Sequence, residues 1–156
     1  MRVGIGHDTH RLAEGRPLIL GGVRVEHARG LVGHSDADVV LHALTDALLG
    51  AAGLGDIGTH FPDTDPKWKN ACSLLFLEHV RGLLAQHRLR IMHLDAIVIT
   101  ERPKLGPHFA AMKEALAGAL GIDASHINLK AKTNEGVGAV GRGEAIAAQA
   151  IATLEG

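Results

Sequence analysis

The sequence has few of the residues that several functional classes require. Its 156 residues include one cysteine, Cys72, no tyrosine, three phenylalanines and one tryptophan, Trp68. A single cysteine excludes an internal disulfide and any multi-cysteine zinc or iron–sulfur site. Four aromatic rings of this kind do not favour a stacking platform for nucleic-acid bases.

Long apolar runs and an excess of charge of one sign are also missing. No run approaches the roughly 18 apolar residues of a membrane-spanning helix, and the first residues lack the pattern of a signal peptide. Lys and Arg number 16 against 17 Asp and Glu, so the net charge gives no reason to expect binding to nucleic acid or to an anionic membrane. We therefore expect a cytoplasmic protein with one domain over residues 1–156.

Histidine and glycine are abundant, with 11 and 20 residues respectively. Many histidines with almost no cysteine favour a hard or borderline metal ion over a thiolate-bound one.

Strand and helix patterns alternate along the chain, which predicts a sheet covered by helices. A capping box of Ser35 and Asp38 predicts a helix that begins at Ser35. The glycine- and proline-rich stretch 53–66 is typical of a loop, and the alanine-rich segment 144–154 fits either a helix or a strand. Strands are predicted over 2–9, 91–100 and 127–133 and as a hairpin over 17–25, and further helices over 70–87 and 107–119.

Three side chains form a candidate metal site. Asp8 and His10 are two residues apart in an extended segment, so both point to one face of the strand. Asp38, His42 and Asp46 recur every four residues on the first helix and share a face. Two His and one Asp with an open coordination position are typical of catalytic zinc. The alternative is a solvated strand end and a solvated helix face, because periodicity does not show that the two elements meet.

Anion-binding positions flank this group. His34 and Ser35 lie where the predicted helix begins, and the free N–H groups of a helix start attract anions. The Asp56 carboxylate could accept hydrogen bonds from sugar hydroxyl groups. Asx turns alone would explain Asp63 and Asp65.

The segment after residue 130 contains Gly136, Gly138 and Gly141 in the spacing G-x-G-x-x-G. A dinucleotide fold is excluded because only 13 residues follow Gly143, too few for the further crossover. One interpretation is a loop that can bind an anion, with Glu135 as a candidate Mg²⁺ ligand and Arg142 as a candidate anion-binding residue. The alternative is a glycine turn between two strands.

Taken together, these motifs resemble the 2-C-methyl-D-erythritol 2,4-cyclodiphosphate synthase family over nearly the whole chain. The matching segments run in order through residues 6–10, 34–39, 42–48, 55–58, 61–66, 102–105, 130–135 and 141–144. The resemblance implies an α+β fold, a small mixed β-sheet with helices packed on one side. It also implies a homotrimer with active sites between subunits, and a strand for the last segment.

The resemblance assigns roles to residues of this sequence. It implies zinc, or another divalent cation, on Asp8, His10 and His42, and magnesium or manganese near Glu135. His34 and Ser35 match positions that hold substrate phosphate. Asp56 matches a contact to the ribose diol, Gly58 lies beside the substrate, and Asp63 is near the methylerythritol portion. The cytidine pocket matches Thr100, Pro103, Lys104, Leu105 and Ala131, and Lys132 and Thr133 match residues that assist phosphate binding and catalysis.

The implied reaction converts 4-diphosphocytidyl-2-C-methyl-D-erythritol 2-phosphate to the cyclic diphosphate and CMP in non-mevalonate isoprenoid precursor synthesis. Some family members bind an isoprenoid phosphate in a central trimer cavity. This sequence departs from the family there, with His7 and Ala139 where aromatic residues are frequent, although Arg142 is retained. Two alternatives remain open at this stage: a zinc phosphodiesterase, and a module that binds nucleotide or isoprenoid phosphate around a structural zinc.

Overall fold

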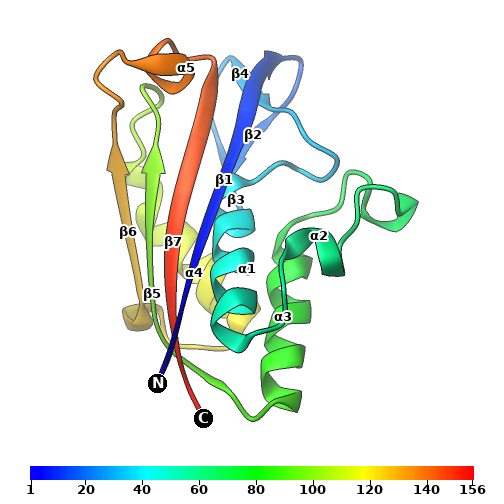
Figure 1. The fold of residues 1–156 in the computed structure, drawn as a ribbon. Coiled ribbons are helices and arrows are strands. Elements are labelled where there is room, and N and C mark those ends of the chain that lie inside the picture. The colour runs from blue at the N-terminus through cyan, green and yellow to red at the C-terminus, as the bar shows by residue number, and fades with distance from the viewer.

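A five-stranded mixed sheet carries helices on one of its faces (Figure 1). The computed structural model describes all 156 residues. The sheet has the order β4-β1-β7-β5-β6, in which β5 and β6 are parallel and the other pairs antiparallel. Its strands are β1 (Arg2–Glu14), β4 (Arg29–Leu31), β5 (Arg90–Ile99), β6 (Ile127–Lys132) and β7 (Ala145–Glu155).

The remaining elements are one hairpin and five helices. The hairpin pairs β2 (Leu18–Leu20) with β3 (Val23–Val25), as the Gly21-Gly22 signal predicts. The helices are α1 (Val39–Ala52), α2 (Ile57–His60), α3 (Leu74–Gln86), α4 (Phe109–Leu120) and α5 (Gly138–Gly141). Short 3-10 turns lie at Pro66–Trp68, Gly106–His108 and Ala124–His126. None of these helices combines the length and apolar character needed to cross a bilayer.

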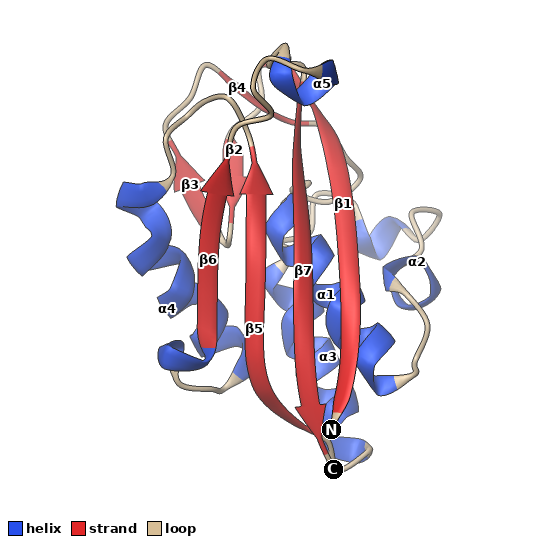
Figure 2. Cartoon of the chain, turned by 60° about the vertical axis from the view of Figure 1, so that its left-hand side comes forward, coloured by secondary structure: helices blue, strands red, loops and turns tan.

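The helices α1, α3 and α4 lie behind the sheet in Figure 2, and the opposite face is bare. The apolar core of 36 residues fills the space between helices and sheet. On the bare face Val3, Ile5 and Ile151 are 60%, 73% and 45% exposed. The expected α+β fold with helices on one side is therefore confirmed.

The alanine-rich last segment is the strand β7, not a helix. It pairs with β1 on one side and β5 on the other, so its backbone groups are satisfied within the sheet. Its buried face carries Ile146, Ala148, Ala150, Ala152 and Leu154. Tertiary pairing overrides the helix propensity of alanine here.

Helix α1 packs against β1 through backbone atoms. Every second residue of β1 faces the helices, and two of these residues are Gly4 and Gly6. A Cβ atom at Gly6 would lie 1.9 Å from the carbonyl oxygen of Ala43. Only glycine permits this approach, which sets how near α1 comes to the strand.

The predicted helix start at Ser35 is wrong. Helix α1 begins at Val39, and the side chain of Asp38 accepts hydrogen bonds from the N–H groups of Val40 and Leu41. A turn with Ala37 at φ +59° separates Ser35 from the helix.

Asp38 also accepts hydrogen bonds from Gly21 N–H at 3.0 Å and Gly22 N–H at 2.7 Å. Its carboxylate thus joins the hairpin to the helix start and does not share a solvated face with His42. Burial raises the pKa of Asp38 to about 6, against the opposing effect of these backbone N–H groups.

The stretch 53–66 is not wholly a loop, because the four-residue helix α2 lies within it. The Asp56 carboxylate caps α2 by accepting from Thr59 N–H at 2.8 Å and from the Thr59 hydroxyl at 2.7 Å.

Candidate metal centre and substrate clefts

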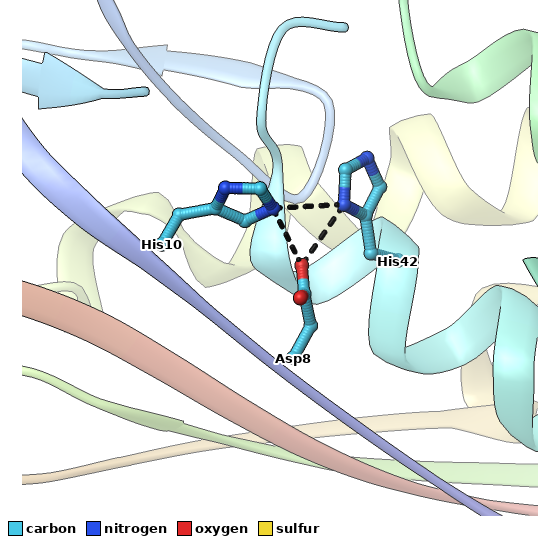
Figure 3. Close-up of side chains that lie close together, drawn as sticks. All are labelled: Asp8, His10 and His42. Atoms are coloured by element: carbon cyan, nitrogen blue, oxygen red, sulfur yellow. Dashed lines mark hydrogen bonds and ion pairs between the residues drawn. The ribbon is translucent and has the colours of Figure 1, made fainter. Parts of the chain in front are cut away.

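Asp8, His10 and His42 converge, as Figure 3 shows. Asp8 and His10 point from the same face of β1, and His42 comes from α1. His42 Nδ1 lies 2.9 Å and His10 Nε2 lies 3.0 Å from Asp8 Oδ2. The two ring nitrogens are 3.3 Å apart. Three N and O ligands this close together, all partly buried, fit a divalent cation.

The pKa shifts of Asp8 and His10 are those expected where a cation and a proton compete for the same ligands. Burial disfavours ionisation of Asp8, but its close contacts with the rings of His10 and His42 outweigh burial and lower the pKa of this carboxyl well below its usual range. Burial also acts to lower the pKa of His10, but the Asp8 carboxylate prevails and raises it. The anionic ligand therefore stays ionised, and His10 keeps a proton more tightly than a free imidazole.

We expect acidification to favour the metal-free protein over the metal-bound one. The pKa of His10 is raised above 6.5 on folding. Its protonated form therefore adds stability that is fully present below pH 6.5 and is lost as the pH rises through the raised pKa. A bound cation needs neutral His10 and competes with that proton.

The rise in Tm produced by a divalent cation should therefore shrink between about pH 8 and pH 6. Thermal unfolding with and without a chelator at each pH measures this difference. A rise that stays constant over this range would contradict the expectation.

The outer nitrogens of both histidine rings have fixed partners. His10 Nδ1 lies 2.6 Å from the carbonyl oxygen of Val32 and must donate to it, which leaves the lone pair of Nε2 directed at the group. His42 Nε2 lies 3.0 Å from both Ser35 Oγ and Ser73 Oγ. Such partners orient the ligands of metal sites.

A cleft of about 450 Å³ opens over the candidate metal group. Of the substrate-binding residues predicted from the sequence, His34, Ser35, Gly58 and Asp63 line this cleft. Asp56 is not part of its lining and instead caps α2.

One wall of this cleft is aromatic. Phe61 stacks on Phe76 with ring centroids 4.3 Å apart, and Trp68 meets Phe61 edge-on at 5.0 Å. Phe76 in turn stacks on His42 at 5.8 Å. Sequence reasoning missed this wall, because Phe61 follows α2, Trp68 lies in a 3-10 turn and Phe76 lies in α3, so no single periodic pattern contains them.

Asp46 has a role that its four-residue spacing from His42 did not reveal. Its carboxylate accepts a hydrogen bond from Ile57 N–H at 2.7 Å and thereby ties the start of α2 to α1. Burial raises the pKa of Asp46 against the effect of this bond. The stretch that carries Asp56 and Gly58 is thus fixed relative to the candidate metal group.

A second cavity, of about 570 Å³, lies between the ends of β5 and β6 and the segment after β5. It is lined by the predicted residues Thr100, Pro103, Lys104, Leu105, Ala131, Lys132 and Thr133. No residue lines both cavities. Within one chain, the predicted site residues therefore form two groups.

Glu135 and Arg142 lie outside both linings. The Glu135 carboxylate accepts from the Thr133 hydroxyl at 2.9 Å. The segment that carries it is held by Glu101, which accepts from Asn134 N–H at 2.8 Å. Arg142 pairs with Glu144, with Nε–Oε1 at 2.8 Å.

The fold and these sites define a class of protein: an α+β protein with a candidate Asp-His-His metal centre at a cleft. The family model described as the YgbB family matches residues 1–155. The chain belongs to this family.

Named relatives agree with that assignment. The 2-C-methyl-D-erythritol 2,4-cyclodiphosphate synthase of Symbiobacterium thermophilum is 57% identical over 156 residues, which cover 100% of this chain and 99% of the relative. A solved 2C-methyl-D-erythritol-2,4-cyclodiphosphate synthase in a CDP-bound form is 41% identical, with a TM-score of 0.90 and coverage of 99% of this chain and 100% of that one. The resemblance found in the sequence is therefore confirmed.

The bifunctional IspDF from Campylobacter jejuni is also similar, with 42% identity and a TM-score of 0.89. The match covers 98% of this chain and 42% of that longer one. The present chain thus spans less than half of the bifunctional protein.

Proposed function

We propose that this protein converts 4-diphosphocytidyl-2-C-methyl-D-erythritol 2-phosphate to 2-C-methyl-D-erythritol 2,4-cyclodiphosphate and CMP. The observation that carries the proposal is the Asp8, His10 and His42 group at a cleft that also contains Ser35, in a chain of the YgbB family. The reaction is an intramolecular phosphoryl transfer, in which an oxygen of the 2-phosphate attacks the β-phosphorus and CMP leaves.

The candidate metal group fits zinc or another divalent cation, since it offers two imidazole nitrogens and one carboxylate oxygen. Bound there, such a cation would polarise and help to position phosphate oxygens. Magnesium or manganese near Glu135 would add a second positive charge. Both assignments follow the donor types, because carboxylate oxygen suits Mg²⁺ and imidazole suits zinc.

The chain's own residues hold and fold the substrate. His34 and Ser35 bind phosphate in the first cleft, while Asp56, Gly58 and Asp63 contact the ribose and the methylerythritol. Thr100, Pro103, Lys104, Leu105 and Ala131 bind cytidine in the second cavity, where Lys132 and Thr133 neutralise and orient the diphosphate. A phosphate is already an anionic nucleophile, so the main requirement is alignment, which contributes roughly 7–11 kcal/mol in well-oriented intramolecular reactions.

A homotrimer would join the two groups of residues. One chain separates the candidate metal cleft from the cavity around Lys132, and the bare sheet face leaves Val3 and Ile5 exposed. Packing of three such faces would bury these side chains. It would also bring the cytidine pocket of one subunit to the metal cleft of its neighbour.

The trimer would also enclose a central cavity. His7 lies on the bare face of β1, and Arg142 is exposed, with Glu144 as its partner. Arg142 would supply the positive charge for an isoprenoid phosphate in that cavity. The polar ring of His7 and the small Ala139 offer less apolar surface to the isoprenoid tail than aromatic side chains would.

Phosphorus NMR of the purified protein with the diphosphocytidyl substrate, zinc and magnesium tests the proposed reaction. We expect the cyclic diphosphate and CMP to form in equal amounts, and a chelator to stop the reaction. A linear diphosphate product would instead indicate hydrolysis by metal-bound water, as in a phosphodiesterase. Binding without turnover would indicate a nucleotide-binding module, and either result would overturn the proposal.

A further inference from the structure

Ser73 occupies the N-cap position of α3 but does not cap the helix. A serine at this position ordinarily accepts a hydrogen bond from an N–H group of the first helical turn. The hydroxyl of Ser73 makes no such bond, and the side chain is completely buried. Its oxygen instead lies between His42 Nε2, at 3.0 Å, and the carboxylate of Asp36.

The donors in this chain of contacts can be assigned. The Asp36 carboxylate can only accept, and it receives Ser73 N–H at 2.9 Å as well as the Ser73 hydroxyl. With its proton donated to Asp36, the Ser73 oxygen offers only lone pairs to His42. His42 Nε2 must therefore carry a hydrogen and donate it, and the neutral ring then offers the lone pair of Nδ1 to a cation. That lone pair faces Asp8 and His10 (Figure 3).

We infer that Asp36 and Ser73 are positioning residues that hold His42 in the tautomer and orientation required of a metal ligand. Asp36 acts through the Ser73 hydroxyl, and Ser73 acts through His42. The inference adds to the proposed function by naming what lies behind the candidate metal group. It concerns metal binding, which is measured without substrate, so its failure is distinguishable from failure of the proposed reaction.

Ser35 is the natural comparison, because its oxygen is equally close to His42 Nε2, at 3.0 Å. Ser35 Oγ accepts from Ala37 N–H at 3.2 Å and forms no hydrogen bond with the Asp36 carboxylate. Ser35 lines the cleft, whereas Ser73 does not. Ser35 Oγ also lies 3.4 Å from Ser73 Oγ, so of the two serines only Ser73 joins His42 to the Asp36 carboxylate.

The affinity for zinc, measured by competition with a chromophoric chelator in the absence of substrate, tests the inference. Ser73→Ala should weaken zinc binding by about 10- to 100-fold, the range found when partners of metal-bound histidines are removed. Asp36→Asn should weaken it similarly. An asparagine amide can donate to Ser73 Oγ, which turns the serine hydroxyl toward His42 as a donor and selects the wrong tautomer. Ser125→Ala, at an exposed serine away from the candidate metal group, is the matched control and should leave zinc affinity unchanged.

A double variant shows whether Asp36 and Ser73 affect zinc affinity through one chain of contacts or independently of each other. If Asp36 acts through Ser73, Ser73→Ala combined with Asp36→Asn should bind zinc no more weakly than the worse single variant. Multiplied losses would overturn the inference, and so would unchanged affinity in both single variants. Thermal unfolding in the presence of chelator controls for a purely structural effect: a lower Tm with unaltered zinc affinity would assign Ser73 to the fold alone. Asp36→Asn preserves the shape of the side chain and gives a second measurement if Ser73→Ala does not fold.

Discussion

Replacing Asp8 by asparagine is expected to deprive the protein of its metal and to slow CMP release by about three orders of magnitude. The substitution preserves the shape of the side chain but removes the only negative charge among the three candidate ligands. Loss of several kcal/mol of charge stabilisation in the transition state corresponds to this factor. Metal content by elemental analysis and CMP release by chromatography are the two measurements.

The fold should survive this change, because the core of 36 apolar residues does not include the candidate metal group. Circular dichroism of Asp8→Asn should therefore match that of the unaltered protein. His87→Ala, at an exposed histidine directly after α3, is the control and should keep both metal and activity. Full activity in Asp8→Asn would refute the metal site, and unfolding on loss of metal would make the metal structural.

Replacing Gly6 by alanine is expected to destabilise the folded protein by about 3 kcal/mol or more. The new Cβ would lie 1.9 Å from the carbonyl oxygen of Ala43 and 2.8 Å from the backbone nitrogen of Ala47. Both obstacles are backbone atoms of α1, so no side-chain rotation relieves the clash and the helix must move away from β1. Urea unfolding of the metal-free protein measures the loss.

The same displacement should separate His42 from Asp8, so any folded Gly6→Ala protein should also bind a divalent cation more weakly. Gly82→Ala is the control. This glycine lies inside α3 with nothing within 4 Å of the added Cβ, and alanine should stabilise the helix by up to about 1 kcal/mol. Equal stability of Gly6→Ala and the unaltered protein would show that α1 does not depend on this close approach.

The sequence predicted the members of the candidate metal group better than it predicted the local structure around them. The two-residue spacing of Asp8 and His10 placed both on one face of a strand, and the structure agrees. Spacing did not show that His42 would meet them. That contact depends on the glycines at positions 4 and 6, which no periodicity rule marks as a helix contact.

The errors have physical causes in tertiary structure. The capping box centred on Ser35 failed because Asp38 receives four backbone N–H groups, two of them from the hairpin tip at Gly21 and Gly22. Ser73 had no signal at all, since a lone serine acquires its role only from neighbours distant in the chain. The strand assignment of β7 came from the family resemblance, because alanine propensity and alternation pointed in different directions.

The contact between α1 and β1 has a consequence for how this protein can change over evolutionary time. Main-chain atoms form it, and every amino acid shares those atoms. Exchanges among the large apolar residues of α1, such as Leu44 and Leu48, can be absorbed by neighbouring side chains without altering the distance between helix and strand. No such adjustment can make room for a Cβ atom at Gly4 or Gly6, where backbone atoms of α1 lie in the way, so substitutions at these two positions should be selected against more strongly than exchanges within the apolar core.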